Sequence, residues 1–390
     1  MKKIFTLATA LMLTTAAFAQ EAIWGVNSLI SPEVHPDNTV TFRFKAPKAV
    51  RVQVVGDFIK DRNADGYRIA DLKEGDKGIW EFTTGKLDSE LYSYCFIVDG
   101  LQVTDPLNVY MNRDVNSVNN IFIVKGGKGD LYSVNDVPHG TVSKVWYDSP
   151  TLGMKRRMTV YTPAGYEDNS KTKYPVFYLL HGRGGDEEAW MDLGRASQIL
   201  DNLIAQGKAK PMIVVMTNGN VSQEAAPGQT SQGLVPPNAN LPKTMEGSFE
   251  TSFPDVVKYI DNHYRTIRKK EGRAIAGLSM GGFHSLHISM QYPDMFDYVG
   301  LFSSAIMPHE GVSSPVYENI DEKLAVQFSK KPALYWIGIG NADFLYQANT
   351  DFRKKLDDAG YKYTYYESDG GHIWRNWRIY LSMFVPQLFK

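Results

Sequence analysis

Residues 273–287 read RAIAGLSMGGFHSLH, an apolar run that leads into a glycine-rich turn and then into a helical pattern. The five residues from Gly277 to Gly281 fit G-x-S-x-G, with Ser279 at the centre. Between a strand and a helix, this sharp turn holds the serine in strained backbone geometry, so its neighbours must be small. It also places Ser279 at a helix N-terminus, where N–H groups and the helix dipole favour negative charge. The pentapeptide alone also occurs in ordinary turns, but this context predicts a nucleophilic serine.

A second glycine-rich segment, residues 181–185 with the sequence HGRGG, directly follows the apolar run 175–180. Its glycines allow the backbone to approach a ligand closely, because they carry no side chain. Upstream of a G-x-S-x-G turn, such a segment is expected to present one N–H of an oxyanion hole, and Met280 the other. Losing one such donor typically costs about 3 kcal/mol of transition-state stabilisation. A plain turn is the alternative, and the position of the segment argues against it.

Of the eight histidines in the sequence, His372 has the best position for a general base. It lies in a glycine-rich turn that follows the predicted strand 363–366 and precedes a predicted C-terminal helix. Catalytic residues are often carried by loops that a rigid scaffold positions. His372 is therefore predicted to take the proton of Ser279.

Asp343 is the candidate acid, because it directly follows the predicted strand 333–340. Its carboxylate is expected to accept the ring N–H of His372, which fixes the tautomer and stabilises the imidazolium ion. Asp369 is the rival, but it lies so close to His372 in sequence that a turn-forming role is favoured. The chain order Ser279, Asp343, His372 is that of α/β-hydrolases.

The segments around these motifs alternate between strand and helix patterns. Residues 175–180 and 212–216 are near-continuous apolar runs, which suit parallel strands covered on both faces. Helical patterns cover residues 187–206 and 254–265. This alternation predicts an α/β domain over residues 141–390.

The preceding part of the chain is predicted to be all-β. Residues 40–44, 50–54 and 79–82 alternate between apolar and polar side chains, and Asp99-Gly100 is a strong signal for a tight hairpin. We expect a β-sandwich module over residues 20–125. Glycine and proline clusters then predict a linker at 126–140.

The first residues resemble an export signal. Lys2 and Lys3 precede a short apolar run, and Ala17-Phe18-Ala19 supplies a small-x-small cleavage pattern. We expect cleavage after Ala19 and a secreted or periplasmic protein.

The composition of the chain argues against several kinds of partner and site. The formal net charge of -1 gives no electrostatic reason to expect nucleic acid or an anionic membrane as a partner. The one cysteine, Cys95, excludes an intramolecular disulfide and fits a packed hydrophobic residue. His284 and His287 could share one helix face, but no third ligand is spaced as in zinc helices, so no metal is expected. The oligomeric state cannot be read from the sequence.

Residues from about 140 to 390 resemble the esterase-D-like group of carbohydrate esterases, carbohydrate esterase family 1, which includes feruloyl and acetyl-xylan esterases. The matching stretches are HGRGG at 181–185, GLSMGG at 277–282, GNAD at 340–343 and GHIW at 371–374. Residues from about 22 to 125 are similar to the early-set β-sandwich of family-48 carbohydrate-binding modules. That match rests on Gly56-Asp57-Phe58, Trp80, Tyr92-Ser93-Tyr94 and Val98-Asp99-Gly100.

The resemblance implies an α/β-hydrolase domain preceded by a small immunoglobulin-like sandwich. It implies a serine esterase without cofactors, with Arg183 supplying the second oxyanion N–H. The implied substrate is an acetyl or feruloyl ester on a plant polysaccharide such as xylan. Three alternatives stay open: a siderophore esterase, an acyltransferase and a non-catalytic glycan-binding protein that retains the fold.

Substrate contacts are less well specified. Gly182, in the oxyanion segment, and Trp374, beside His372, are the candidate substrate-binding residues. An aromatic ring near the histidine could stack on a sugar or a phenolic acyl group, but Trp374 could equally belong to the core. The long polar segment 218–245 lacks periodicity and is either functional or a surface excursion.

Overall fold

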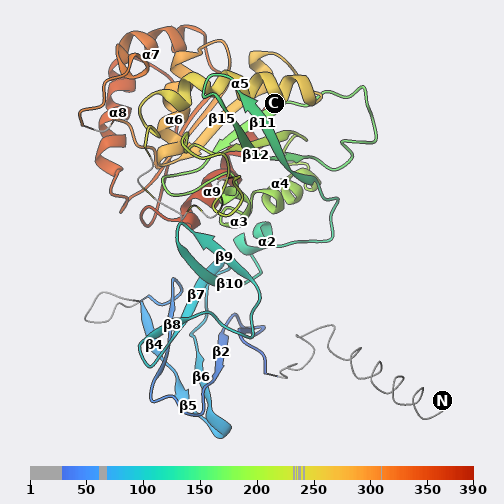
Figure 1. Ribbon diagram of the computed structural model, residues 1–390, viewed down its shortest axis with the longest axis vertical. Helices are drawn as coiled ribbons and strands as arrows, with labels where there is room; N and C mark the ends of the chain where they lie inside the picture. Colours follow the sequence, from blue (N-terminus) through green and yellow to red (C-terminus); the bar gives the residue numbers. More distant parts are fainter. Residues whose placement is uncertain are drawn as a thin grey trace, which may run out of the picture. The chain divides into compact units, whose positions relative to one another are not determined.

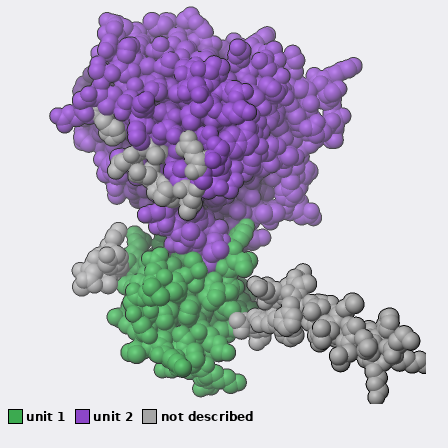
Figure 2. All heavy atoms as spheres, viewed as in Figure 1, with its two compact units in different colours: residues 1–87, 94–110 green, residues 88–93, 111–390 purple. Residues whose placement is uncertain are grey.

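The computed structural model describes residues 29–60, 68–231, 233, 235, 239, 242–308 and 310–390. The predicted signal peptide therefore lies outside the described residues. The chain forms two compact units, residues 1–87 with 94–110 and residues 88–93 with 111–390 (Figure 2). Among the described residues, no helix combines the length and the apolar character that a membrane span requires.

The first unit contains two antiparallel β-sheets. One has the strand order β1-β2-β6-β5; in the other, β3 lies between β4 and β7, and β8 pairs with β7. Residues of β7 from Tyr94 onward belong to this unit. The strands are β1 (Glu33–Val34), β2 (Val40–Lys45), β3 (Val52–Gly56), β4 (Ile69–Asp71), β5 (Lys73–Glu74), β6 (Ile79–Thr83), β7 (Leu91–Val98) and β8 (Leu101–Val103).

Aromatic side chains join the two sheets of this unit. The ring of Phe42 on β2 meets the ring of Tyr94 on β7 edge-on, with centroids 4.9 Å apart. Asp99 and Gly100 form the turn between β7 and β8 with φ of 49° and 88°, as the hairpin signal predicts. The predicted β-sandwich is confirmed.

The second unit is built on an eight-stranded sheet with the order β11-β12-β14-β13-β15-β16-β17-β18. β11 and β12 are antiparallel to their neighbours, and the strands from β14 to β18 run parallel. The strands are β11 (Thr141–Ser149), β12 (Met154–Thr162), β13 (Val176–Leu180), β14 (Ile213–Thr217), β15 (Arg273–Leu278), β16 (Tyr298–Phe302), β17 (Leu334–Gly340) and β18 (Thr364–Ser368).

Helices cover both faces of this sheet (Figure 1). Side chains alternate along β13: Tyr178 packs in a cluster with α5, α6, α7 and α8, whereas Phe177 packs in a cluster with α4 and α9. The helices are α3 (Ala189–Asp192), α4 (Ala196–Ala205), α5 (Ser248–His263), α6 (Met280–Gln291), α7 (Ile320–Ser329), α8 (Tyr346–Asp358) and α9 (Trp374–Phe384). The predicted α/β-hydrolase architecture is confirmed.

The sheet gathers the predicted site residues at one edge. His181 follows β13, Ser279 follows β15, Asp343 follows β17 and His372 follows β18. Because these strands are parallel, their carboxyl ends lie on the same edge, where open α/β sheets bind their ligands.

A hairpin upstream of the sheet also belongs to the second unit. It consists of β9 (Met111–Asp114) and β10 (Ser117–Ile123), and α2 (Lys128–Tyr132) follows it. Ile121 and Tyr132 are buried in the cluster that contains α4 and α9. The segment predicted as a linker, residues 126–140, therefore contains a helix fixed by its apolar side chains.

Two helical segments differ from their predictions. Residues 187–206 form two helices, α3 and α4, which are separated at Arg195, where φ is 54°. α5 spans Ser248–His263, so it begins six residues before the predicted start at Pro254 and contains that proline. The buried Phe249 and Phe253 extend the apolar stripe upstream of the proline, and this packing explains the longer helix.

Candidate active site

Ser279 lies between β15 and α6 with φ 54° and ψ -115°, a conformation that non-glycine residues rarely adopt. A Cβ atom on Gly277 would lie 2.4 Å from the carbonyl carbon of Gly281. A Cβ atom on Gly281 would lie 2.4 Å from the carbonyl oxygen of Leu180. Only glycine fits at either position, so the structure has the strained turn that G-x-S-x-G predicts.

The backbone of Ser279 is fixed by the segment at the end of β16. Its N–H donates to the carbonyl of Phe302 at 2.9 Å, and the N–H of Ala305 donates to its carbonyl at 3.1 Å. These bonds hold the strained residue in place from a neighbouring strand, as a pre-organised nucleophile requires.

Asp343 and His372 are brought together from different loops. The ring Nδ1 of His372 lies 2.9 Å from Asp343 Oδ2 and 3.0 Å from Oδ1, and the N–H of Leu345 also donates to the carboxylate. Burial would raise the pKa of Asp343, but the hydrogen bonds from His372 and Leu345 outweigh it and lower this pKa. The aspartate is thus a carboxylate that accepts the proton on Nδ1, which leaves Nε2 as the basic atom.

The rival acid, Asp369, has another partner. Its Oδ1 accepts a hydrogen bond from the Asn341 side chain at 3.2 Å, and Asn341 in turn accepts the N–H of Gly370. Asp369 therefore shapes the turn before His372, and the structure pairs the imidazole with Asp343.

The oxyanion segment lies directly beside the nucleophile. A Cβ atom on Gly182 would lie 2.4 Å from a methyl group of Leu278 and 3.3 Å from the Cβ of Ser279. Gly182 is thus required by packing against the turn. The N–H of Met280 belongs to the first turn of α6, whose amides have no acceptor within the helix. The exposed Arg183 side chain donates to the carbonyl of Ala239 at 2.5 Å.

His181 ties the oxyanion segment to the loop after β14. Its Nδ1 lies 2.7 Å from the carbonyl oxygen of Gly182, and the N–H of Gly219 donates to its Nε2 at 2.8 Å. Burial lowers the pKa of His181 to about 4, so the ring is neutral and accepts from Gly219. His181 therefore acts as a structural bridge.

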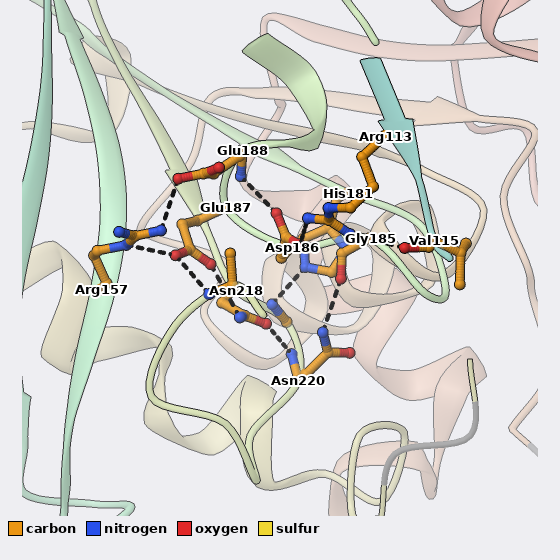
Figure 3. A network of polar contacts seen from close by, with 12 residues as sticks. Arg113, Val115, Arg157, His181, Gly185, Asp186, Glu187, Glu188, Asn218 and Asn220 are labelled. Carbon is orange, nitrogen blue, oxygen red and sulfur yellow. Dashed lines mark hydrogen bonds and ion pairs between the residues drawn. The ribbon is translucent and has the colours of Figure 1, made fainter. Parts of the chain in front are cut away.

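Three consecutive acids that the sequence reasoning did not single out follow the oxyanion segment (Figure 3). Glu187 is fully buried, and its carboxylate accepts hydrogen bonds from Arg157, Ala226 and Asn218 at 2.7–3.0 Å. Arg157 also donates to Glu188 at 2.7 Å. These contacts anchor both the oxyanion segment and the start of the segment 218–245. Their only sequence signal is an acidic run directly after a glycine-rich turn.

Replacing Glu187 by glutamine should lower the free energy of unfolding by about 3 kcal/mol, because Arg157 then keeps a buried charge with only part of its compensation. In this variant, the NH₂ group of the new glutamine would also face the NH₂ group of Asn218, which now donates to the Glu187 carboxylate, so two donors would meet without an acceptor. Urea unfolding measures the change. Lys144→Ala, which breaks the more exposed pair with Glu188, is the control and should cost at most about 1 kcal/mol. Equal losses in both variants would contradict the prediction.

Two aromatic rings lie next to the imidazole of His372. The ring of Phe344 lies 4.5 Å from the imidazole, and the ring of Trp377 lies 4.9 Å from it. Phe344 is 76% exposed, and Met307, which follows the segment bonded to Ser279, is 72% exposed. Sequence reasoning missed both, although Phe344 directly follows the predicted acid.

Trp374 is half-buried in an aromatic cluster. Its ring meets the rings of Trp190 and Trp377 edge-on, with centroids 5.3 Å and 5.1 Å away. This packing shows that Trp374 contributes to the core. Because part of its side chain is still exposed, contact between Trp374 and a substrate stays a prediction.

The predicted packing role of the two histidines on α6 agrees with their surroundings. His284 and His287 are both buried, and His284 Nδ1 lies 2.7 Å from Glu250 Oε1. Within the described ranges, no group of three histidine, cysteine, aspartate or glutamate residues could hold a metal ion.

Comparisons with known families match two separate parts of the chain. Residues 149–388 match a family model described as "Putative esterase". Residues 30–108 match carbohydrate-binding module 48, the isoamylase N-terminal domain.

Curated relatives include an endo-1,4-beta-xylanase/feruloyl esterase from Xylanibacter ruminicola, 31% identical over 366 residues. That alignment covers 92% of this chain but 46% of the relative, so the chain spans about half of its length. An esterase from Mycobacterium tuberculosis is 27% identical, with 74% of this chain and 67% of the relative covered.

Among solved structures, the CE1 ferulic acid esterase from Anaeromyces mucronatus is 26% identical, with a TM-score of 0.56 over 67% of this chain and 95% of that one. A second structure of it holds ferulic acid. The enterobactin esterase from Shigella flexneri matches 89% of this chain and 92% of its own, with a TM-score of 0.60. At 17% identity, that likeness concerns the fold alone.

Proposed function

The chain belongs to the esterase family whose model matches residues 149–388, and from this premise we propose that it is a serine carboxylic-ester hydrolase acting on feruloyl or acetyl esters of plant cell-wall polysaccharide. The observation that carries the proposal is the Asp343–His372 hydrogen bond, which lies at the same carboxyl edge of the sheet as the strained turn that presents Ser279. Export through the predicted signal peptide is part of the proposal, since an intact polysaccharide lies outside the cell.

The reaction proceeds by two acyl transfers. Nε2 of His372 takes the hydroxyl proton of Ser279 while the serine oxygen attacks the ester carbonyl carbon. The backbone N–H groups of Met280 and Arg183 donate to the oxyanion that forms. His372 returns the proton to the departing alcohol oxygen, which leaves an acyl-serine. His372 then activates water, which releases the acid and restores the serine hydroxyl.

Within this reaction, Asp343 keeps the His372 proton on Nδ1 and stabilises the imidazolium ion that forms twice per cycle. A carboxylate with a lowered pKa stays ionised while the imidazole gains its second proton. This division of roles explains why an acid at this position acts without exchanging a proton itself.

An aromatic acyl group is the favoured substrate part. Phe344, Met307 and Ile373 expose 76%, 72% and 44% of their surface, and each lies within four residues of Asp343, His372 or the segment bonded to Ser279. Exposed apolar side chains at such positions suit a planar phenolic ring better than a methyl group. The Xylanibacter and Anaeromyces relatives carry feruloyl and ferulic acid esterase in their names, which supports the same choice.

The aromatic side chains described in the N-terminal module give little support for glycan binding. Trp80 and Tyr94, which carry the family resemblance, are both buried, and the Trp80 indole donates to the carbonyl of Ala46 at 3.0 Å. Tyr110 is 44% exposed. These aromatics support a packing role for Trp80 and Tyr94, so glycan binding by this module is not part of the proposal.

A substrate panel with product identification by mass spectrometry tests the proposal. We expect release of ferulate from wheat arabinoxylan and from methyl ferulate, with less acetate from acetylated xylan. Enterobactin serves as the third arm because the Shigella enzyme shares the fold. Release of acetate alone would reassign the acyl group, and hydrolysis of enterobactin alone would overturn the polysaccharide assignment.

A further inference from the structure

The β9–β10 hairpin lies in a stretch to which neither family match extends, since one ends at residue 108 and the other begins at 149. Its two strands are joined by the two-residue turn Val115-Asn116. Figure 3 shows Arg113 and Val115 from this hairpin beside Gly185 of the oxyanion segment and Asp186, which directly follows that segment. These neighbours are about 70 residues apart in sequence.

Arg113 connects the hairpin to Asp186, the residue directly after the oxyanion segment. Its guanidinium forms an ion pair with the carboxylate of Asp186, which is almost fully buried. The same guanidinium donates to the carbonyl of Val115 at 3.0 Å. Asp186 also accepts the N–H of Glu188 at 3.0 Å. One carboxylate thus joins the hairpin tip to the backbone that follows the oxyanion segment.

Val115 makes the second contact. A Cβ atom on Gly184 would lie 2.7 Å from Cγ2 of Val115, so the valine side chain packs directly on the glycine backbone. Val115 has a φ of 54°, in a left-handed region that β-branched residues rarely adopt. Two-residue hairpin turns prefer asparagine or glycine at such positions. A strained residue that touches a functional loop is a reason to look for a role beyond turn formation.

The hairpin also reaches the first residue of α9, which lies two residues after His372. Asp114, an exposed residue at the end of β9, interacts with the side chain of Trp374, and this interaction opposes the rise that partial desolvation causes in the pKa of Asp114. Trp374 follows His372 by two residues and begins α9. Residues 113–115 therefore contact the oxyanion segment, the residue that follows it and the first residue of α9.

We propose that the tip of the β9–β10 hairpin positions the oxyanion segment for catalysis, with Arg113 acting through Asp186 and Val115 acting through Gly184. The inference rests on the proposed esterase function. An oxyanion donor works only when it lies at hydrogen-bond distance from the oxygen of the transition state. A misplacement of about 1 Å can cost about 100-fold in rate. Residues 113–115 are positioning residues, since they act on the backbone that carries the donor.

The first test is Arg113→Ala in the full-length protein, assayed with methyl ferulate. We expect kcat to fall by about 10- to 100-fold while KM changes little, because the contact acts on the transition state. Inhibition by phenylboronic acid, whose tetrahedral adduct with Ser279 mimics that state, should weaken in parallel. Arg113→Lys should recover part of kcat, since a lysine retains the charge but donates less specifically. Lys144→Ala is the matched control: it breaks a pair with the same acidic run, and its kcat should equal that of the wild type.

The second test is Val115→Gly, which relieves the strained φ and should leave the unfolding temperature unchanged or higher. We expect its kcat to fall several-fold, a result that a purely structural role does not give. If Arg113→Ala unfolds, this variant decides the question alone. An active wild type together with unchanged kcat in the folded variants would overturn the inference only. An inactive wild type would overturn the proposed function and this inference with it.

Discussion

Ser279→Ala is expected to lower kcat for methyl ferulate by about 10⁶-fold, because the oxygen that attacks the ester carbonyl is removed. The remaining donors of the oxyanion hole can still polarise a bound carbonyl, but no acyl-serine forms. The variant should fold as the wild type does. Its turn is held by the backbone bonds from Phe302 and Ala305, which involve no side-chain atom of residue 279.

The measurement is steady-state hydrolysis together with thermal unfolding of both proteins. Ser289→Ala is the matched control. It removes a buried hydroxyl, which donates to the carbonyl of Leu286, from α6, the helix that follows Ser279. This variant should keep the kcat of the wild type. Hydrolysis by the folded Ser279→Ala protein at more than a small fraction of the wild-type rate would refute the nucleophile assignment.

Asp343→Asn should lower kcat by about 10⁴-fold while leaving the fold intact. The amide nitrogen can donate to Nδ1 of His372, which moves the imidazole proton to Nε2, where it blocks the base. The amide also lacks the charge that stabilises the imidazolium ion. Because the carboxylate already accepts from His372 and Leu345 in a buried setting, an isosteric amide occupies the same space.

Asp369→Asn is the companion variant, since this is the acid that sequence reasoning weighed against Asp343. Its carboxylate bonds to Asn341 and is exposed, so kcat should change only slightly. An inactive Asp369→Asn protein beside an active Asp343→Asn protein would reverse the assignment of the acid.

The parts of the site that could be predicted from the sequence are those with a local physical cause. The steric need for glycine at 277 and 281 is contained in a five-residue turn, so the pattern identifies the strained serine directly. Asp343 and His372 could be predicted to lie together because each comes from a loop after a recognisable strand, and parallel strands bring such loops to one edge. The fold class followed from the same alternation of strands and helices.

The parts that could not be predicted depend on pairs far apart in sequence. Arg113 and Asp186 are 73 residues apart, and Arg157 and Glu187 are 30 apart, and neither pair leaves a periodic signal. α2 was not predicted because the glycines at 126, 127 and 129 resemble a linker, whereas the apolar residues that fix the helix are only two, Leu131 and Tyr132. In each case tertiary packing decided what the local composition left open.

The path of the chain between the two units has a consequence for how such proteins are recombined. Residues 88–93 belong to the second unit, the chain then returns to the first at 94–110, and it leaves again at 111. The first unit is therefore built from two separate stretches of the chain, and no single cut in the sequence separates it from the second unit. An expression fragment that begins at residue 141 would discard Leu91 and Ile121, which are part of its buried apolar cluster. Gene fusions that exchange the N-terminal module must therefore keep the β9–β10 hairpin together with the second unit.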